Sequence, residues 1–216
     1  MHNKISMNTQ QIFKYHFSQN IKDENFFVNQ TNQIAYDTTL SKNFEQNIFL
    51  YGPKKSGKTQ LINTWSKYND AIIYKDNFSE ILNLKKNIAI DDVFDSISEE
   101  NLFHIINHCG LYNLKIYLSS SCKLTNYNFQ LKDLSSRIKA FYFLNINMPD
   151  DEMCKMLMTK LFSDKQIIIK NKEIFDFILN RVNRTYNDIF LFIEKIDSLS
   201  LEKKRQLTIP LIKEIL

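Results

Sequence analysis

Apolar residues along the chain follow two different patterns, one in each part of the sequence. Up to about residue 148, short and nearly continuous apolar runs alternate with stretches in which apolar residues recur every three or four positions. Continuous runs are typical of strands buried on both faces, and the wider spacing is typical of amphipathic helices. The runs that predict strands are 47–51, 71–74, 87–92, 114–119 and 140–144. This alternation predicts an α/β fold with a parallel five-stranded sheet between helices.

Helices are expected between these strands, in the segments 29–40, 60–68, 78–84, 98–110 and 134–138. Ser98 stands where a helix N-cap is expected, and Gly110 is expected to end the same helix.

From about residue 149 only the helical spacing remains. The segments that carry it are 150–162, 173–182 and 185–199. Thr208 is expected to cap a last helix, whose first turn tolerates Pro210. The organisation predicted is therefore a tail (1–22), an α/β core (23–148) and a small helical lid (149–216).

Composition narrows the class of protein. Hydrophobic residues make up 44% of the chain and charged residues 24%, as in soluble globular proteins. The net charge of +4 comes from lysines spread along the chain, which allows a weak DNA contact without arguing for one. The 3 cysteines form no C-x-x-C pair and fit free thiols in a reducing compartment. No signal core or apolar run of ~20 residues occurs, so the expectation is a cytoplasmic protein without a membrane span.

One stretch has the pattern of a phosphate-binding loop, Gly52-Pro53-Lys54-Lys55-Ser56-Gly57-Lys58-Thr59. It fits G-x-x-x-x-G-K-[ST] and lies between a predicted strand and a predicted helix, which is the context that the pattern requires. Glycine lets backbone N–H groups approach phosphate oxygens closely. Lys58 is expected to reach the phosphates of ADP or ATP, and the Thr59 hydroxyl to ligate Mg²⁺. The alternative is a plain strand–turn–helix with a glycine-bearing turn.

Two carboxylates, Asp91 and Asp92, follow the third predicted strand. In a doubly wound sheet that end of the strand lies beside the phosphate loop. Asp91 is then expected to hold the Mg²⁺ shell together with Thr59, and Asp92 to orient a water for hydrolysis. Two solvated aspartates at a turn are the alternative.

Four stretches together resemble the Hda family of AAA+ ATPases, the regulatory relatives of the bacterial initiator DnaA. They are residues 52–59, 88–92, 133–138 and 205–216, and the likeness extends from about residue 11 to the C-terminus. DnaA would continue into a DNA-binding helix-turn-helix domain, and the sequence ends where that domain would begin.

The resemblance implies two protein partners, the sliding clamp and DnaA. Proteins like Hda bind the sliding clamp of DNA polymerase III on DNA and promote hydrolysis of the ATP held by DnaA. Gln11, Ile12, Phe13 and Tyr15 match the clamp-binding position of the tail. Arg137 matches the arginine that such proteins offer to a neighbour's γ-phosphate. A surface arginine at a helix end is the alternative.

Three positions depart from the family pattern. Lys55 stands where glycine is usual, and Ser121 stands at the sensor position of the nucleotide site, where DnaA-type proteins have an acidic residue. Asn187 stands where the lid arginine is expected, and Arg184, one turn away, is the substitute considered. These departures suggest a domain that holds its nucleotide structurally and hydrolyses ATP poorly.

Other functions stay open on the sequence alone. One is an autonomous P-loop ATPase that uses Asp92, and another is an adaptor that binds partners without assisting chemistry. Arg137 could also meet a second copy of the chain in a homo-oligomer. The basic run 203–205 could touch DNA, or it could be a solvated charge run.

Overall fold

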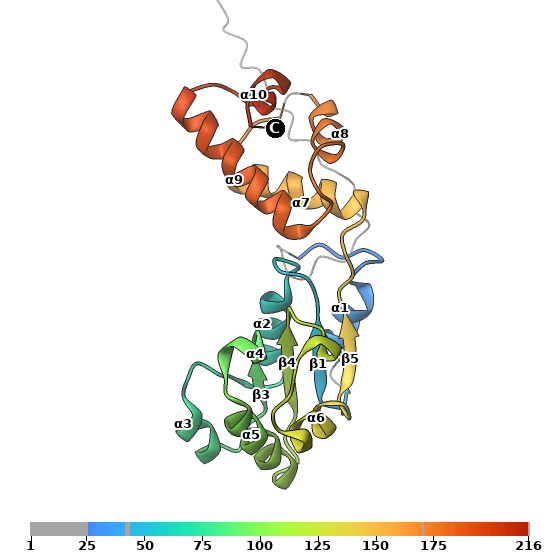
Figure 1. Ribbon diagram of the computed structural model, residues 1–216, viewed down its shortest axis with the longest axis vertical. Helices are drawn as coiled ribbons and strands as arrows, with labels where there is room; N and C mark the ends of the chain where they lie inside the picture. Colours follow the sequence, from blue (N-terminus) through green and yellow to red (C-terminus); the bar gives the residue numbers. More distant parts are fainter. Residues whose placement is uncertain (1–25, 42–43, 170, 216) are drawn as a thin grey trace, which may run out of the picture.

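The computed structural model describes residues 26–41, 44–169 and 171–215, and a parallel sheet forms its centre (Figure 1). The strands are β1 (Ile48–Tyr51), β2 (Ile72–Ile73), β3 (Ile88–Ile90), β4 (Ile116–Ser120) and β5 (Tyr142–Asn145). Their order is β2-β3-β4-β1-β5, and every neighbouring pair is parallel. The predicted five-stranded parallel sheet is confirmed. Its order places the carboxyl ends of β1, β3 and β4 side by side, where a ligand site is expected.

Helices cover both faces of the sheet. The helices of the core are α1 (Gln33–Leu40), α2 (Lys58–Tyr68), α3 (Phe78–Asn83), α4 (Val93–Ser96), α5 (Glu99–Leu111) and α6 (Lys132–Ile138), with a short 3₁₀ turn η1 (Leu124–Asn126) before α6. Side chains alternate between the faces along each strand. Leu50 and Tyr117 are buried with residues of α1 and α2, whereas Phe49 and Leu118 are buried with residues of α3 to α6.

The helix end predicted at Gly110 is wrong. Helix α5 continues through Gly110 to Leu111, and Tyr112 is its C-cap. Asn113 then adopts the left-handed backbone (φ 54°) that ends the helix, a conformation that asparagine tolerates. The N-cap predicted at Ser98 is confirmed, since its side chain accepts a hydrogen bond from the N–H three residues later.

Four helices make up the lid: α7 (Asp151–Asp164), α8 (Glu173–Leu179), α9 (Tyr186–Lys203) and α10 (Ile209–Lys213). They enclose a hydrophobic core of their own, in which Met158, Phe162 and Ile193 are buried. The cap predicted at Thr208 is confirmed, and Pro210 lies in the first turn of α10. The lid lies beyond the carboxyl ends of the strands (Figure 1). Across the described ranges, no helix combines the length and apolar character needed to cross a bilayer.

The residues before α1 join the lid to the core. The Asn29 side-chain amide donates to both carboxylate oxygens of Asp150, at 2.9 and 3.0 Å, and Gln30 donates to the same carboxylate at 3.0 Å. Asp150 also caps α7 by accepting from the Met153 N–H at 2.7 Å. Burial alone would raise the pKa of Asp150, and these hydrogen bonds together lower it. The first lid helix is therefore fixed to the core by one carboxylate.

Candidate nucleotide-binding site

Both glycines of the predicted phosphate loop occupy places where a side chain would clash. Gly57 has a φ of 95°, and a Cβ there would lie 2.6 Å from the Phe26 ring. A Cβ at Gly52 would lie 2.9 Å from Ser56 Oγ and 3.0 Å from Ile146 Cβ. The loop therefore needs glycine for its backbone conformation at one position and for close packing at the other.

Lys55 keeps the left-handed backbone that the loop imposes, with a φ of 65°. For a non-glycine residue this conformation costs about 1 kcal/mol. Its ammonium group lies 4.3 Å from the centre of the Phe190 ring on lid helix α9, a cation–π contact that offsets part of the cost. The departure from glycine thus gives the loop a contact with the lid.

The loop fits an anion with several oxygen atoms. Among the described residues, no acceptor takes a hydrogen bond from the amide N–H groups of Lys54, Lys55, Gly57 and Lys58. The buried hydroxyl oxygen of Ser56 also lacks a described partner. Successive backbone N–H groups in a loop between a strand and a helix can donate together to the oxygen atoms of a phosphate.

Lys58 is the buried cation of the site. Its side chain is 5% exposed, and its Nζ donates to the Pro53 carbonyl at 3.1 Å and to Ser121 Oγ at 2.9 Å. Asp92 Oδ1 lies 3.9 Å away. Burial lowers the pKa of Lys58, and the charges of Asp92 and Asp91 oppose that shift. A buried ammonium with one distant carboxylate is suited to pair with phosphate.

Thr59 and Asp91, the predicted Mg²⁺ ligands, lie together at the carboxyl ends of the strands. The Thr59 hydroxyl donates to Asp91 Oδ2 at 2.5 Å, and the Ser119 hydroxyl donates to Asp91 Oδ1. Within the described ranges, no group of three or more His, Cys, Asp or Glu residues could hold a metal by itself. That fits Mg²⁺, which proteins commonly bind through one or two side chains together with phosphate oxygens and water.

Asp92 and Ser121 form the second half of the site. Asp92 is the N-cap of α4 and has a φ of 42°. Its N–H donates to Ser119 Oγ at 2.9 Å, and its carboxylate accepts from Ser121 Oγ at 3.0 Å. Ser121 therefore contacts both Lys58 and Asp92, so a neutral hydroxyl occupies the position where an acidic residue was expected from the family.

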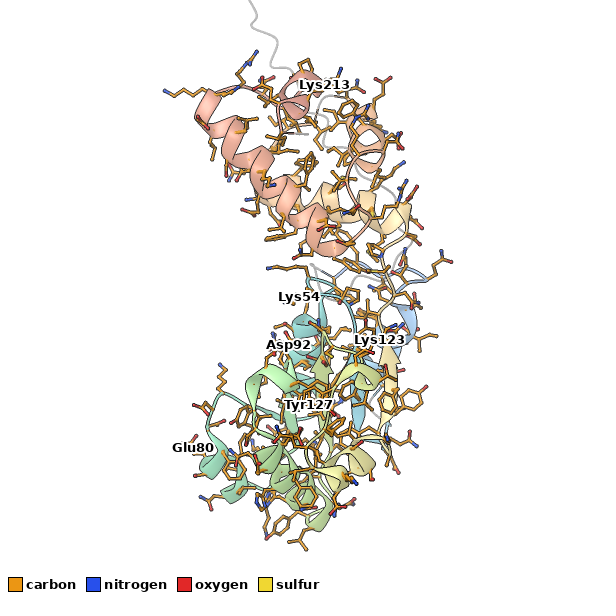
Figure 2. All side chains as sticks on the ribbon, in the orientation of Figure 1. Lys54, Glu80, Asp92, Lys123, Tyr127 and Lys213 are labelled. Carbon is orange, nitrogen blue, oxygen red and sulfur yellow. The ribbon has the colours of Figure 1, made fainter. Side chains whose placement is uncertain are left out.

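The loop residues 54–59, together with Asp92 and Ser121, line a cleft of about 890 Å³ between core and lid. Lys54 and Asp92 lie on the side of the core that faces the lid (Figure 2). The lining residues from the lid are Lys160, Asp164 and Asn187. Arg184 is not among them, because its Nε donates to Asp151 Oδ1 at 2.5 Å. Of the two lid candidates, Asn187 is therefore the one that faces the cleft.

Sequence reasoning missed Lys160 and Asp164 as cleft residues. The one signal available was Lys160 itself, a lysine in the same helical register as the buried Met153 and Met156 of α7. A charged residue beside an apolar stripe often lies at the edge of a buried surface.

Arg137 lies far from this cleft, on exposed helix α6. Helix α6 precedes β5, whose first residue pairs with Ile48 at the amino end of β1. The phosphate loop follows Tyr51 at the carboxyl end of β1. Arg137 therefore lies toward the opposite end of the sheet from the chain's own phosphate loop (Figure 1).

Helix α5 fixes both ends of α6. Glu99 accepts hydrogen bonds from the Leu131 N–H at 2.7 Å and from the Gln130 N–H at 3.1 Å, which caps the start of α6 from a neighbouring helix. Four residues after Glu99, the Phe103 ring lies 5.1 Å below the Arg137 guanidinium carbon. One face of α5 therefore sets the position of Arg137.

Two other groups of predicted residues have different outcomes. Gln11, Ile12, Phe13 and Tyr15 lie outside the described residues. In the basic run 203–205, Lys203 and Arg205 both form ion pairs with Glu214. These ion pairs link the end of α9 to the end of α10.

Comparisons with known proteins agree with this architecture. Residues 150–216 match a family model described as "Hda, lid domain". The chain is 28% identical to the chromosomal replication initiator protein DnaA of Buchnera aphidicola subsp. Cinara cedri, a match that covers 89% of this chain and 51% of DnaA. It thus spans about half the length of this relative. An uncharacterized protein of Haemophilus influenzae is 25% identical, with 89% of this chain and 92% of that protein covered.

Solved structures of DnaA have the same fold. Domain III of the Thermotoga maritima DnaA superposes with a TM-score of 0.72 at 22% identity, covering 89% of this chain and 94% of that chain. AMPPCP-bound DnaA from Aquifex aeolicus superposes with a TM-score of 0.65 at 22% identity, covering 84% of this chain and 67% of that chain.

Proposed function

We propose that this chain, an AAA+ protein related to Hda and to the initiator DnaA, regulates DNA replication by stimulating hydrolysis of the ATP that DnaA holds. In this proposal Arg137 is the residue that acts on the partner's nucleotide. The chain's own cleft holds ADP or ATP and serves to maintain the structure that presents Arg137.

The observation that carries the proposal is the place of Arg137. Its guanidinium is exposed, held over Phe103 and separated from the chain's own phosphate loop by the length of the sheet. It can therefore serve only a nucleotide on a neighbouring molecule. A guanidinium placed against a γ-phosphate stabilises the charge of the transition state and contributes roughly 10³–10⁵ in rate in GTPases.

The residues of the cleft support a structural role for its nucleotide. Loop amides and Lys58 would hold the phosphates, and Thr59 with Asp91 would hold Mg²⁺, which supplies charge neutralisation at the phosphates. In this proposal Asp92 would orient a water, but its carboxylate accepts a hydrogen bond from Ser121 and its side chain is one methylene shorter than that of glutamate. We infer slow hydrolysis in the chain's own site.

Clamp binding is proposed from the sequence of the tail alone. Gln11 followed by Ile12, Phe13 and Tyr15 fits a peptide laid into an apolar groove of the sliding clamp. Such binding would bring the chain to DnaA near newly replicated DNA.

The decisive experiment measures ATP turnover by DnaA with clamp-loaded DNA, in the presence and absence of this chain. Wild type is expected to accelerate turnover, and Arg137→Ala to leave it near the basal rate. Arg181→Ala is a matched control, because Arg181 is an exposed lid arginine whose guanidinium lies 3.8 Å above the Phe177 ring. Equal turnover with wild type and Arg137→Ala would overturn the proposal.

A second candidate is an autonomous ATPase, and the assembled Lys58, Thr59, Asp91 and Asp92 favour it. It predicts that the purified chain alone turns over ATP and that Lys58→Ala abolishes this turnover. The adaptor function predicts clamp binding with no change in turnover by either protein.

A further inference from the structure

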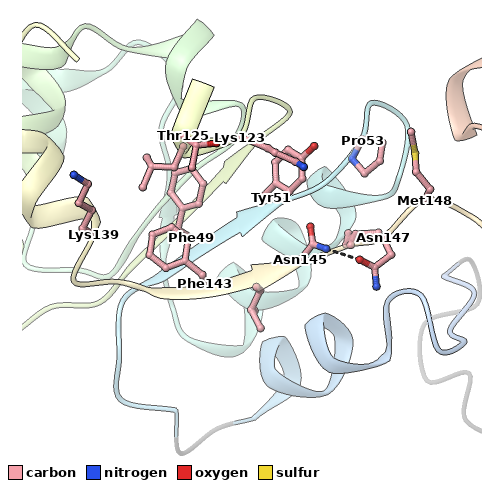
Figure 3. Close-up of a pocket in the computed structure, with 13 residues that line it drawn as sticks. Phe49, Tyr51, Pro53, Lys123, Thr125, Lys139, Phe143, Asn145, Asn147 and Met148 are labelled. Carbon is pink, nitrogen blue, oxygen red and sulfur yellow. Dashed lines mark hydrogen bonds between the residues drawn. The ribbon is translucent and has the colours of Figure 1, made fainter. Parts of the chain in front are cut away.

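A groove of about 790 Å³ runs over the sheet between β1 and β5, on the side away from α1 and α2 (Figure 3). It is separate from the nucleotide cleft. The residues that line it include Phe49, Tyr51, Lys123, Lys139, Phe143 and Met148. Helices α3 to α6 cover the same face over β3 and β4 and leave this part open.

The floor of the groove is apolar, with Phe49 fully buried and Phe143 and Met148 exposed. Strand register pairs Phe49 with Phe143, and their rings lie 5.5 Å apart. Phe143 is 46% exposed and Met148 is 57% exposed. Exposed aromatic and methionine side chains gathered in one groove indicate a surface that another molecule covers.

The charges of the groove are all positive. Lys139 lies by the amino end of β5, and Lys123 lies by the carboxyl end of β1, with its Nζ 5.7 Å from the Tyr51 ring. Neither lysine forms an ion pair with a described residue, and no carboxylate lines the groove. Lys139 and Lys123 thus lie toward opposite ends of the strands beneath the groove, which suits an extended segment with a carboxylate near each lysine.

Strand β5 also offers main-chain groups. It lies at the end of the sheet order, and it pairs with β1 through the N–H groups of Tyr142 and Ile146. Because alternate residues of a strand turn toward one neighbour, the N–H and C=O groups of Phe143 and Asn145 turn away from β1. These groups lie at the edge of the sheet and not over the groove, and farther along the same edge the Asn147 N–H already donates to the Thr31 carbonyl at 2.9 Å.

Lys139 follows Arg137 by two residues, so the groove begins within one helical turn of the proposed finger. We propose that the groove docks an extended apolar segment with carboxylates at both ends, on the AAA+ core of the DnaA molecule that Arg137 serves. This inference rests on the proposed function. A nucleic-acid strand fits less well, because it needs cations along its length and the groove has them only at its ends.

The test uses the full chain and the ATP-loaded AAA+ core of DnaA, and measures affinity and turnover separately. Phe143→Asp and the double variant Lys123→Glu/Lys139→Glu are expected to weaken binding at least about tenfold. The maximal turnover at saturation should stay unchanged, whereas Arg137→Ala should lower maximal turnover and keep the affinity. Leu201→Asp is the control, since Leu201 is a 71% exposed residue on the lid. Unfolding by urea checks that each variant folds.

Each outcome separates the docking surface from the proposed function. Loss of binding in both groove variants supports the docking surface even if wild type stimulates no hydrolysis, in which case only the proposed function fails. Binding equal to wild type in both variants overturns the docking surface while leaving Arg137 untouched. The inference also fails if Phe143→Asp instead dissociates a dimer of this chain, or if it weakens only binding of a single-stranded oligonucleotide.

Discussion

Lys58 and Arg137 lie toward opposite ends of the core, and the two regions differ in how the cation is held. At the carboxyl ends of the strands, Lys58 is buried and lies among Pro53, Ser121 and Asp92. Around α6 and β5, Arg137 and Lys139 are exposed, and neither forms an ion pair with a described residue. The first arrangement is suited to retain a ligand, and the second is suited to offer charge to another molecule.

The difference has an energetic reason. Buried polar contacts are strong because little water competes with them, and an unpaired buried group is costly, so such a site favours a ligand that completes it. An exposed cation without a protein partner costs little free energy because water solvates it, but other residues must hold it in position. On this chain Glu99 and Phe103 of α5 supply that support for Arg137.

The largest effect is expected from a substitution that disrupts only the buried site around Lys58. Lys58→Ala should lower ADP affinity by about 100-fold, because it removes charge-assisted hydrogen bonds to phosphate worth about 1.5–3 kcal/mol each. Titration with a fluorescent ADP analogue measures this. Lys139→Ala, which removes an exposed lysine from the other end, should leave ADP affinity unchanged. Similar losses in both variants would contradict the comparison.

A smaller effect is expected from substitutions that disrupt only the exposed site around Arg137. Glu99→Ala removes the cap of α6, an interaction worth about 0.5–2 kcal/mol, and Phe103→Leu removes the ring beneath Arg137. Each should lower the stimulated turnover of DnaA by about tenfold while ADP affinity stays at the wild-type value.

The control for this prediction is Glu100→Ala, the next residue on the same helix, which should behave as wild type. Full stimulation by Glu99→Ala would show that α6 holds Arg137 in place without help from α5.

The two regions should also respond oppositely to alkaline pH. The pKa of Lys58 lies below its ordinary 10.5 because of burial, so the unfolded chain binds more protons between the two values and stability rises with pH. Burial raises the pKa of Cys109, on α5, from 9.0 to about 12, so the unfolded chain loses its proton first and stability falls above pH 9.

Urea unfolding under reducing conditions between about pH 8 and 11 separates these contributions. Lys58→Met should steepen the alkaline loss of stability, and Cys109→Ala should flatten it. Parallel curves for wild type and both variants would be inconsistent with these shifts.

The smallest effect concerns backbone strain in the phosphate loop. Lys55→Gly relieves a left-handed residue, whereas Lys54→Gly only adds chain entropy to the unfolded state. Lys55→Gly should therefore be more stable than Lys54→Gly by about 1 kcal/mol in thermal unfolding. Equal stabilities would mean that the contact of Lys55 with Phe190 compensates for the strain.

Much of the fold and part of the site followed from local patterns. Apolar runs predicted the strands because β1, β3 and β4 are buried on both faces, and the runs of β2 and β5 were apolar enough to be recognised although their residues are partly exposed. The phosphate loop was recognisable because its backbone demands glycine at fixed spacing. The end of α5 was misplaced because glycine is a common helix terminator, yet Asn113 took the left-handed conformation instead. The short α4 has 4 residues, too few for a periodic signal.

By itself the sequence determined which elements form and which residues carry the phosphate chemistry, because helix period, strand pattern and loop conformation depend on neighbouring residues. Only the tertiary structure decided which distant residues meet. Sheet order brings Ser121 to Lys58, 63 residues away, and the packing of α5 on α6 brings Glu99 to Gln130, 31 residues away. The lid side of the cleft and the groove beside β5 depend on the same long-range packing, whose free energy comes from burial between elements.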